Sequence, residues 1–324
     1  MKAALCKRLD GPEGIEIEDI PAPAAGRGEA VVAVKAAALN FFDTLITRGK
    51  YQTKPELPFS PAGEIAGVVT AVGDGVADVA VGDRVMAYVG FGGAREQIAV
   101  PADALVPIPD GVSDTAAAGV AITYGTAIHG LKDRGHVQPG ETVAVLGAAG
   151  GAGLAAVEIA KLMGAHVVAV ASSEEKLSVC KAHGADTLLN YADTDLKSAL
   201  RALNGGAGVD VVYDCVGGDS SEAALRAMAW EGRFLVVGFA SGEIPKVPLN
   251  LLLLRGADAV GVFWGEAVAR DPQGHRANMR QILAWVAEGK LNPRLHATFA
   301  LDDIRDAIGV LDRREAVGKV VLTV

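Results

Sequence analysis

The stretch of sequence that decides the fold is TVAVLGAAGGAGLAAVEIAKLMGA, residues Thr142–Ala165. It opens with the apolar run Thr142–Leu146, which has the length of a buried strand, and continues into a helical segment of small and apolar residues. Gly147, Gly150 and Gly153 lie on the turn between them. Glycine lets the backbone turn sharply, lets N–H groups approach an anion and lets the helix pack closely on the strand. Because the helix N-terminus adds about half a positive charge, this turn predicts a pyrophosphate site.

The spacing is G-x-x-G-x-x-G rather than G-x-G-x-x-G, and by itself such a pattern is a weak signal. The sequence on either side strengthens it, because strands alternate with helices of about ten residues, which is typical of a parallel sheet covered on both faces. The following strands are predicted at His166–Ala171, Thr187–Leu189, Val209–Asp214, Phe234–Val237 and Ala259–Trp264, with helices at Glu174–His183, Asp195–Leu203 and Ser221–Trp230.

The N-terminal third has a different hydrophobic pattern. Short apolar runs are separated by glycine-rich turns, few segments are long enough for a helix, and the pattern predicts a compact, barrel-like β domain. The runs are Ala30–Lys35, Ile65–Val72, Asp83–Tyr88 and Gln97–Val100. The C-terminal end is predicted to hold helices at Asn278–Glu288 and Leu301–Leu311 and a final strand at Lys319–Val324.

The composition excludes several classes of protein. Half of the 324 residues are hydrophobic and 21% are charged, which excludes an intrinsically disordered chain. A net charge of −9 without any basic cluster makes nucleic acid an unexpected partner. Cys6, Cys180 and Cys215 are far apart and form neither a disulfide framework nor a zinc motif. Since the sequence has no signal-peptide or membrane-spanning pattern, we expect a cytoplasmic globular protein.

The end of the second predicted strand bears on which dinucleotide binds. An NAD site usually has Asp or Glu there, about 20 residues after the turn, accepting from the ribose hydroxyls. Here the strand ends in Ala171, Ser172 and Ser173, and Lys176 follows in the next helix. Two hydroxyls and an ammonium suit a 2′-phosphate, although Ser173 could equally be an N-cap and Lys176 a surface lysine. On the residues alone we favour NADP(H).

Motifs along the whole chain carry a family resemblance. They are PAPAAGRGEAVVAVKAAALNFFDTLITRGKY, GEIAGVVTAVG, VGDRV, TYGTA, the turn at Gly147–Gly153, VVYDCVGG, VVGFASG and the terminal GKVVL. Together they resemble the medium-chain dehydrogenase/reductase superfamily, and within it the zinc-independent quinone oxidoreductase branch to which zeta-crystallin belongs. The resemblance implies an α/β protein, with a GroES-like catalytic domain over residues 1–121, a Rossmann NADP-binding domain over 122–263 and a return to the catalytic domain over 264–324. It also implies a homodimer joined through the outermost Rossmann strand, expected at Ala257–Phe263.

The same resemblance bears on metal binding. Zinc-dependent relatives have a cysteine ligand at the position of Asn40, a His-Glu pair at Gly63-Glu64 and a further cysteine near Ala118. A catalytic zinc needs three protein ligands, and only Glu64 remains of this set. We therefore expect no metal site and a reaction that does not depend on zinc.

A quinone or an activated alkene already accepts electrons, so it needs mainly a well-placed dihydronicotinamide and hydrogen bonds to the developing oxyanion. The resemblance places Asn40 beside the nicotinamide and the substrate oxygen, and its amide is our candidate donor. Tyr51 matches a tyrosine of the cleft, and Asp43 matches a residue near the cofactor for which a structural role is equally open. Leu45 replaces a second tyrosine of some relatives.

Position along the family motifs also assigns the cofactor contacts. Ser172, Lys176 and Tyr191 match the 2′-phosphate pocket, so NADP(H) becomes the expected cofactor. Phe263 and Trp264 match the nicotinamide side, with a place in the core or a dimer contact as the alternative. The full expected set is Thr123, Gly147, Gly150, Gly151, Ala152, Gly153, Ser172, Ser173, Lys176, Tyr191, Val216, Phe239, Phe263, Trp264 and Lys319.

Two other functions stay open at this stage. The first is NADPH-dependent reduction of an enal or enoyl thioester, for which Arg48, Lys50 and Lys54 could form a basic groove for a phosphorylated carrier. The second is a non-enzymatic NADPH-binding role. The expected partner of the catalytic role is a small quinone or activated alkene.

Overall fold

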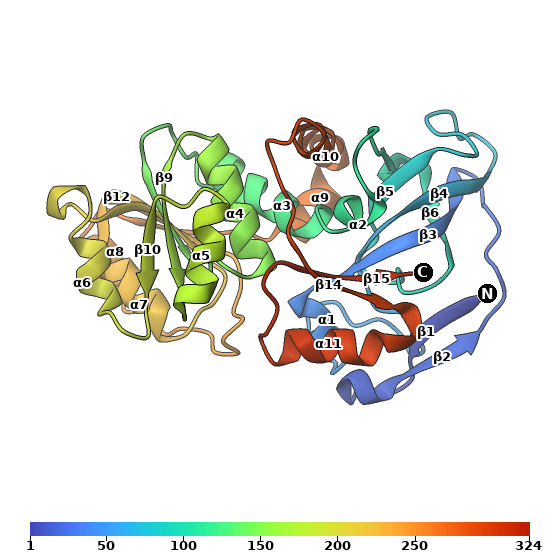
Figure 1. Ribbon diagram of the computed structural model, residues 1–324, viewed down its shortest axis with the longest axis horizontal. Coiled ribbons are helices and arrows are strands. Elements are labelled where there is room, and N and C mark those ends of the chain that lie inside the picture. The colour runs from blue at the N-terminus through green and yellow to red at the C-terminus, as the bar shows by residue number, and fades with distance from the viewer. The chain divides into compact units, whose positions relative to one another are not determined.

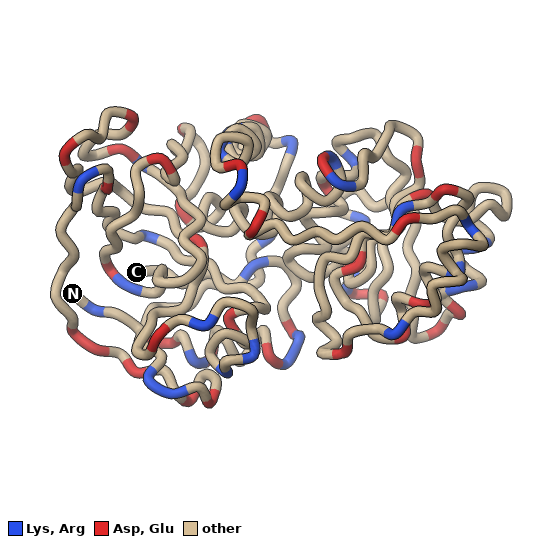
Figure 2. The backbone as a smooth tube through the Cα atoms, turned by 180° about the vertical axis from the view of Figure 1, so that it is seen from behind, with Lys and Arg blue, Asp and Glu red and all other residues tan.

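The computed structural model describes residues 1–324 and divides into two compact units (Figure 1). The first unit comprises Met1–Ile122 together with Val268–Val324, and the second comprises Thr123–Ala267. Both chain termini therefore belong to the first unit. Basic and acidic residues are interspersed in both units (Figure 2). None of the helices combines the length and the apolar character needed to span a bilayer.

The first unit is built on a seven-stranded sheet in which the long strand β3 is antiparallel to β4, β6 and β15. Its order is β14-β15-β3-β4-β5-β7, with β6 also paired to β3. The strands are β3 (Glu29–Leu39), β4 (Glu64–Val72), β5 (Arg84–Tyr88), β6 (Gln97–Pro101), β7 (Val106–Pro107), β14 (Leu295–Ala300) and β15 (Lys319–Thr323). Because Val320 pairs with Leu39, the register brings Lys319 to the end of β3, beside Asn40.

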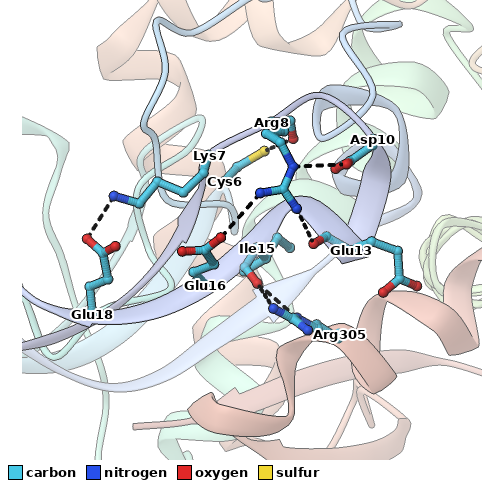
Figure 3. Close-up of polar contacts among 9 residues, drawn as sticks. All are labelled: Cys6, Lys7, Arg8, Asp10, Glu13, Ile15, Glu16, Glu18 and Arg305. Carbon is cyan, nitrogen blue, oxygen red and sulfur yellow. Dashed lines mark hydrogen bonds and ion pairs between the residues drawn. The ribbon is translucent and has the colours of Figure 1, made fainter.

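A separate two-stranded sheet, β1 (Lys2–Cys6) with β2 (Ile15–Asp19), completes the first unit and was not predicted from the sequence. Ion pairs between Lys7 and Glu18 and between Arg8 and Glu16 follow this ladder (Figure 3). Arg305, from the C-terminal helix α11 (Ile304–Asp312), donates from Nε to the Ile15 carbonyl at 2.8 Å. The C-terminal segment is thus tied to the N-terminal one.

Two helices of the first unit, α1 (Phe41–Ile46) and α2 (Asp114–Ala118), were not predicted from the sequence. The two predicted near the C-terminus form as α10 (Pro272–Ala287) and α11. Helix α10 begins at Pro272 rather than at the predicted Asn278. Asp271 is its N-cap, and the carboxylate accepts the Gly274 N–H at 2.9 Å, while Pro272 suits the first helical position because its missing N–H would have no partner there.

The second unit is a parallel six-stranded sheet in the order β10-β9-β8-β11-β12-β13. Its strands are β8 (Thr142–Leu146), β9 (His166–Ala171), β10 (Thr187–Asn190), β11 (Val209–Asp214), β12 (Met228–Val236) and β13 (Asp258–Gly261). The helices are α3 (Ala121–Ile128), a π-helix (His129–Arg134), α4 (Gly151–Leu162), α5 (Glu174–Ala182), α6 (Leu196–Arg201), α7 (Asp219–Arg226), α8 (Asn250–Leu253) and α9 (Trp264–Arg270). The first residues of α3 and the last residues of α9 belong to the first unit. The predicted doubly wound parallel sheet is confirmed.

Boundaries in this unit were predicted wrongly at more than one place. The strand expected at Ala259–Trp264 is observed as Asp258–Gly261, and Trp264 begins α9 instead. The helix expected at Ser221–Trp230 ends at Arg226, and β12 begins at Met228 instead. Met228 is fully buried and pairs with Val209, and the strand then shifts register through Glu231, which has φ +57°. Burial of Met228 and the ladder to β11 outweigh the local helical pattern.

Candidate functional site

The glycine turn of the second unit has the geometry that its sequence predicts. Gly147 has φ +70°, a left-handed conformation that costs a residue with a side chain free energy. A Cβ on Gly153 would lie 2.2 Å from the Gly147 carbonyl oxygen, so helix α4 can approach the turn only because residue 153 has no side chain. Gly147 is therefore required by its backbone conformation and Gly153 by close contact.

No side chain caps the N-terminus of helix α4. Gly150 is the N-cap and provides no side chain to bond the first helical N–H groups, and the first turn contains no acidic residue. The amides of Gly151, Ala152 and Gly153 thus start the helix without intrahelical acceptors. Oriented N–H groups and the positive end of the helix dipole together fit a pyrophosphate at this turn.

The residues expected at the adenosine ribose meet at the end of β9. Lys176 Nζ lies 3.4 Å from Ser172 Oγ, and Tyr191, 44% exposed, follows the adjacent strand β10 and donates its N–H to the Ala171 carbonyl. Ser173 is the N-cap of α5, since its hydroxyl accepts the Lys176 N–H at 3.3 Å. The N-cap interpretation thus holds for Ser173, while Ser172 and Lys176 are half-buried polar neighbours and Tyr191 is exposed at the end of the next strand.

The residues expected on the nicotinamide side differ in their surroundings. Trp264 is 8% exposed and packs on Gly125, where a Cβ would lie 2.8 Å from the indole, which favours the core interpretation. Phe263 is 60% exposed and Thr123 is 4% exposed. Val216 and Phe239 pack against the glycines of neighbouring turns, Gly147 and Gly217 respectively.

The first unit contains a buried ionic cluster at the end of β3. The Lys319 ammonium donates to Glu64 Oε1 at 2.7 Å and to Asn40 Oδ1 at 2.6 Å. Asn40 Nδ2 donates to the same Glu64 oxygen at 2.9 Å. Glu64 Oε2 accepts the Ile122 N–H at 2.8 Å, so all of its near partners are donors. Glu64 is 0% exposed, Lys319 3% and Asn40 8%.

Asp43 lies beside this cluster, and its carboxylate bonds to backbone N–H groups. Its carboxylate accepts the N–H of Asn40 at 2.8 Å and the N–H of Ala62 at 2.9 Å, as an N3 acid does when it caps the start of a helix. Burial raises the pKa of Asp43 to about 7, although the two N–H groups and the Lys319 ammonium act in the opposite direction. These contacts support the structural role that was left open for Asp43.

Tyr51 is half-buried near the same cluster. Its ring packs against Phe42 with centroids 5.3 Å apart, and burial raises the pKa of its hydroxyl. The expected contact of the Lys319 side chain with the cofactor would require the ammonium to leave its partners, because Leu39, Asn40 and Glu64 occupy all three of its protons.

Known proteins resemble this chain over its whole length. Residues 26–110 match the alcohol dehydrogenase GroES-like domain and residues 151–288 match the zinc-binding dehydrogenase family. A quinone oxidoreductase-like protein 2 homolog of Nematostella vectensis is 41% identical over 99% of this chain and 88% of its own length. The chain belongs to the quinone oxidoreductase branch of the medium-chain dehydrogenase/reductase superfamily. It is therefore an oxidoreductase, as predicted, with a GroES-like and a Rossmann domain.

Solved structures of this branch have the same fold. The quinone oxidoreductase of Pseudomonas syringae is 33% identical, with a TM-score of 0.93, and the match covers 100% of this chain and 99% of that one. The quinone oxidoreductase of Escherichia coli, solved with NADPH, is 27% identical with a TM-score of 0.92 and covers both chains completely.

The name of the zinc-binding dehydrogenase family raises the question whether a metal fits here. No group of three His, Cys, Asp or Glu side chains in the chain could hold a metal ion. Glu64 is the one acid retained at the family's metal position, and its carboxylate already faces a cation, Lys319, and two further N–H donors. The residues present do not fit a zinc ion.

The ion pair of Lys319 with Glu64 was not found from the sequence, although both residues were considered. Glu64 was noted only as a remnant of a metal site and Lys319 only as a cofactor contact. The two lie 255 positions apart in the chain, and no local pattern connects them. A buried Glu in an apolar strand opposite an isolated Lys in another is the weak signal that could have suggested a pair, because buried charges are paired.

Proposed function

We propose that this protein is an NADPH-dependent quinone oxidoreductase that transfers reducing equivalents from NADPH to a quinone-type acceptor without zinc. The observation that carries the proposal is the ionic cluster in which Lys319 bonds Asn40 and Glu64, two residues at positions where the family's zinc-dependent members have metal ligands. A quinone needs no Lewis acid, since its carbonyl carbons and ring are electron-poor before they bind. The names of the family members reported above agree with such an acceptor.

The cofactor preference rests on the end of β9. The Lys176 ammonium is near the Ser172 hydroxyl, and no acid follows at the tip of the strand. Glu174, the first acid, accepts from Asn190 Nδ2 at 3.3 Å. A 2′-phosphate would bind to Ser172, Lys176 and Tyr191, and the pyrophosphate to the amides of the α4 N-terminus. NADPH, when bound, supplies the reducing equivalents.

Asn40 is the proposed hydrogen-bond donor to the acceptor oxygen in the first unit, and Tyr51 the proposed aromatic or hydroxyl contact. Asn40 has one amide proton without a partner in the structure, whereas both oxygens of Asp43 accept backbone N–H groups. Asp43 is therefore proposed to hold the Asn40 backbone rather than to take part in proton transfer.

The alternative is reduction of an enal or of an enoyl thioester of coenzyme A. Of the three cations considered for a carrier groove, Arg48 is engaged elsewhere, because its guanidinium forms two bonds to the Asp312 carboxylate, at 3.0 and 2.7 Å. Lys50 and Lys54 remain exposed. Because Asp312 already pairs with one of the three cations, a carrier groove has less support, and this favours the quinone.

The deciding measurement is the initial rate of NADPH oxidation with a small para-quinone, run beside crotonyl-CoA under the same conditions. A saturable rate with the quinone and little with the thioester is expected. The reverse result would move the assignment to enoyl reduction, and turnover of neither acceptor with retained NADPH affinity would favour a non-enzymatic role.

We also propose a homodimer that forms through β13, which lies at one edge of the Rossmann sheet. Large apolar side chains are well exposed in the segment that leads into β13, at Leu249, Leu253 and Leu254, and at Trp230, whose indole lies over Gly256. Light scattering is expected to give twice the chain mass of 33.2 kDa for the wild type and a monomer for Leu249→Glu with Leu253→Glu. A wild-type monomer would contradict the proposed homodimer.

The three cysteines form no disulfide, which agrees with a reducing, cytoplasmic location that cell fractionation can test.

A further inference from the structure

The cluster of Lys319, Glu64 and Asn40 closes on itself. One ammonium bridges Asn40 Oδ1 and Glu64 Oε1, and Asn40 Nδ2 donates to that same Oε1, so the three side chains form a ring of hydrogen bonds. The third ammonium proton goes to the Leu39 carbonyl at 3.2 Å. Lys319 thus has no donor left for a substrate or a cofactor, and any effect it has on either must pass through Asn40.

The ring determines which way the Asn40 amide faces. An ammonium can only donate and a carboxylate can only accept, so Oδ1 must face Lys319 and Nδ2 must face Glu64. Because one ammonium spans Oδ1 and Glu64 Oε1, the amide proton bound to Glu64 is the one on the Oδ1 side. The other amide proton points away from the ion pair, and no hydrogen bond of the structure uses it. Asn40, at 8% exposure, therefore holds one oriented donor at the margin of a buried cluster.

Lys319 also strengthens that donor. A bond from an ammonium to the amide oxygen is charge-assisted, and at 2.6 Å it is short. Positive charge at Oδ1 draws electron density from the amide nitrogen, and in a low-dielectric site linked hydrogen bonds polarise one another. Glu64 keeps the ammonium paired, since an unpaired buried charge would be strongly unfavourable.

We propose that Lys319 is a positioning residue that orients and polarises Asn40, so that the free Asn40 amide proton bonds the acceptor oxygen on which negative charge develops. The proposal takes the identity of the acceptor from the proposed function. The same amide proton could donate to a quinone oxygen or to the carbonyl oxygen of an enal. A fixed positive charge thereby acts on the substrate oxygen through one amide, where a metal ion would act on it directly.

The test uses the full chain with Lys319→Met and Glu64→Gln combined. The ammonium is lost, no unpaired carboxylate stays buried, and the introduced amide oxygen can still accept from Asn40. The matched control, Lys161→Met with Asp186→Asn, removes a 2.6 Å ion pair elsewhere in the chain. We expect kcat with the better wild-type acceptor to fall about 10- to 100-fold in the first pair, with KM and NADPH affinity within about twofold of wild type, and the control to keep the wild-type kcat.

A second readout does not need turnover. Selective ¹⁵N labelling of asparagine marks six side-chain amides in this chain, and Asn40→Ala assigns the signal of Asn40. The diagnostic signal is the Asn40 amide proton that is not bound to Glu64, because a bond to a carboxylate shifts the other proton by itself, as it does for Asn190 beside Asp193. Polarisation by Lys319 predicts that this proton resonates downfield in the wild type and moves upfield in the Lys319→Met, Glu64→Gln pair. A protein without turnover of either acceptor would contradict the proposed function, yet this shift would still decide the role of Lys319.

Two results would overturn the inference. One is a folded Lys319→Met, Glu64→Gln variant with wild-type kcat and an unchanged Asn40 amide signal, which would make the ion pair purely structural. The other concerns Lys319→Arg, which keeps the charge and covers the case in which the first pair does not fold. This variant is expected to retain more kcat and more of the downfield shift than Lys319→Met alone. If Lys319→Arg retains no more of either than Lys319→Met does, the positive charge of residue 319 does not polarise Asn40.

Discussion

The hydroxyl of Tyr124 donates to Glu158 Oε2 at 2.5 Å, and the other oxygen of that carboxylate lies 2.8 Å from Nδ1 of His183. Tyr124 is on α3, Glu158 on α4 and His183 at the end of α5, so one buried carboxylate links three helices of the second unit. Tyr124 is 3% and Glu158 7% exposed. Burial and the adjacent carboxylate raise the pKa of Tyr124 well above its ordinary value, so the hydroxyl stays protonated and continues to donate.

Replacement of Tyr124 by Phe should measure what this link contributes. Removal of the hydroxyl leaves a buried carboxylate with one donor fewer, and hydrogen bonds to charged groups contribute about 1.5–3 kcal/mol. We expect the unfolding free energy from urea titration to fall by that amount. Tyr191→Phe, at an exposed tyrosine, is the control and should change it by less than about 0.5 kcal/mol. Equal small effects for the two variants would show that the link contributes little.

The nucleotide preference can be tested at Lys176. Loss of a charge-assisted bond of about 1.5–3 kcal/mol predicts that Lys176→Ala weakens NADPH binding roughly 10- to 100-fold. Binding of NADH, which has no 2′-phosphate, should hardly change. Fluorescence titration with both nucleotides measures the two constants, and Lys181→Ala, at the far end of the same helix, serves as the control. An equal loss for NADPH and NADH would indicate that Lys176 is structural.

Two glycines of the turn should respond differently to alanine. A Cβ at residue 153 would meet the Gly147 carbonyl oxygen at 2.2 Å, whereas a Cβ at residue 150 has its nearest neighbour at 3.5 Å. Gly153→Ala is therefore expected to move α4 from the turn and lower the melting temperature by several degrees, with a large loss of NADPH affinity. Gly150→Ala should keep the wild-type melting temperature. Scanning calorimetry compares them, and a stable Gly153→Ala variant would contradict the close-contact argument.

The buried carboxyl of Asp43 predicts a pH dependence of stability. Burial raises its pKa from 3.8 to about 7, so between these values the folded protein holds a proton that the unfolded chain releases. The stabilisation linked to this proton is complete below pH 4 and is lost as the pH rises through 7. The difference in unfolding free energy between wild type and Asp43→Asn should therefore decrease from pH 5 to pH 8, by at most about 1.4 kcal/mol per pH unit. A difference that does not vary with pH would exclude the raised pKa.

Prediction from the sequence succeeded where structure depends on neighbouring residues. The turn at Gly147–Gly153 was recognised because its requirements, a left-handed residue and close helix approach, are met by glycines a few positions apart. The parallel strands were found because buried runs of Val, Ile and Leu are local features. The end of α7 was missed because Met228 is a strand residue only through its contact with Val209 in β11.

The candidate site likewise has features that local sequence reveals and one that only tertiary structure decides. From the sequence alone one can recognise the dinucleotide turn, the replacement of the family's cysteine and histidine ligands by Asn40 and Gly63, and the retention of Glu64, because each is a matter of residue type at a local motif. The role of Lys319 was decided by tertiary structure alone. Antiparallel pairing of β15 with β3, in the register that sets Val320 opposite Leu39, delivers its ammonium to a carboxylate 255 residues away. Such registers are set by the hydrogen bonds and burial of a whole sheet, and no segment of sequence contains them.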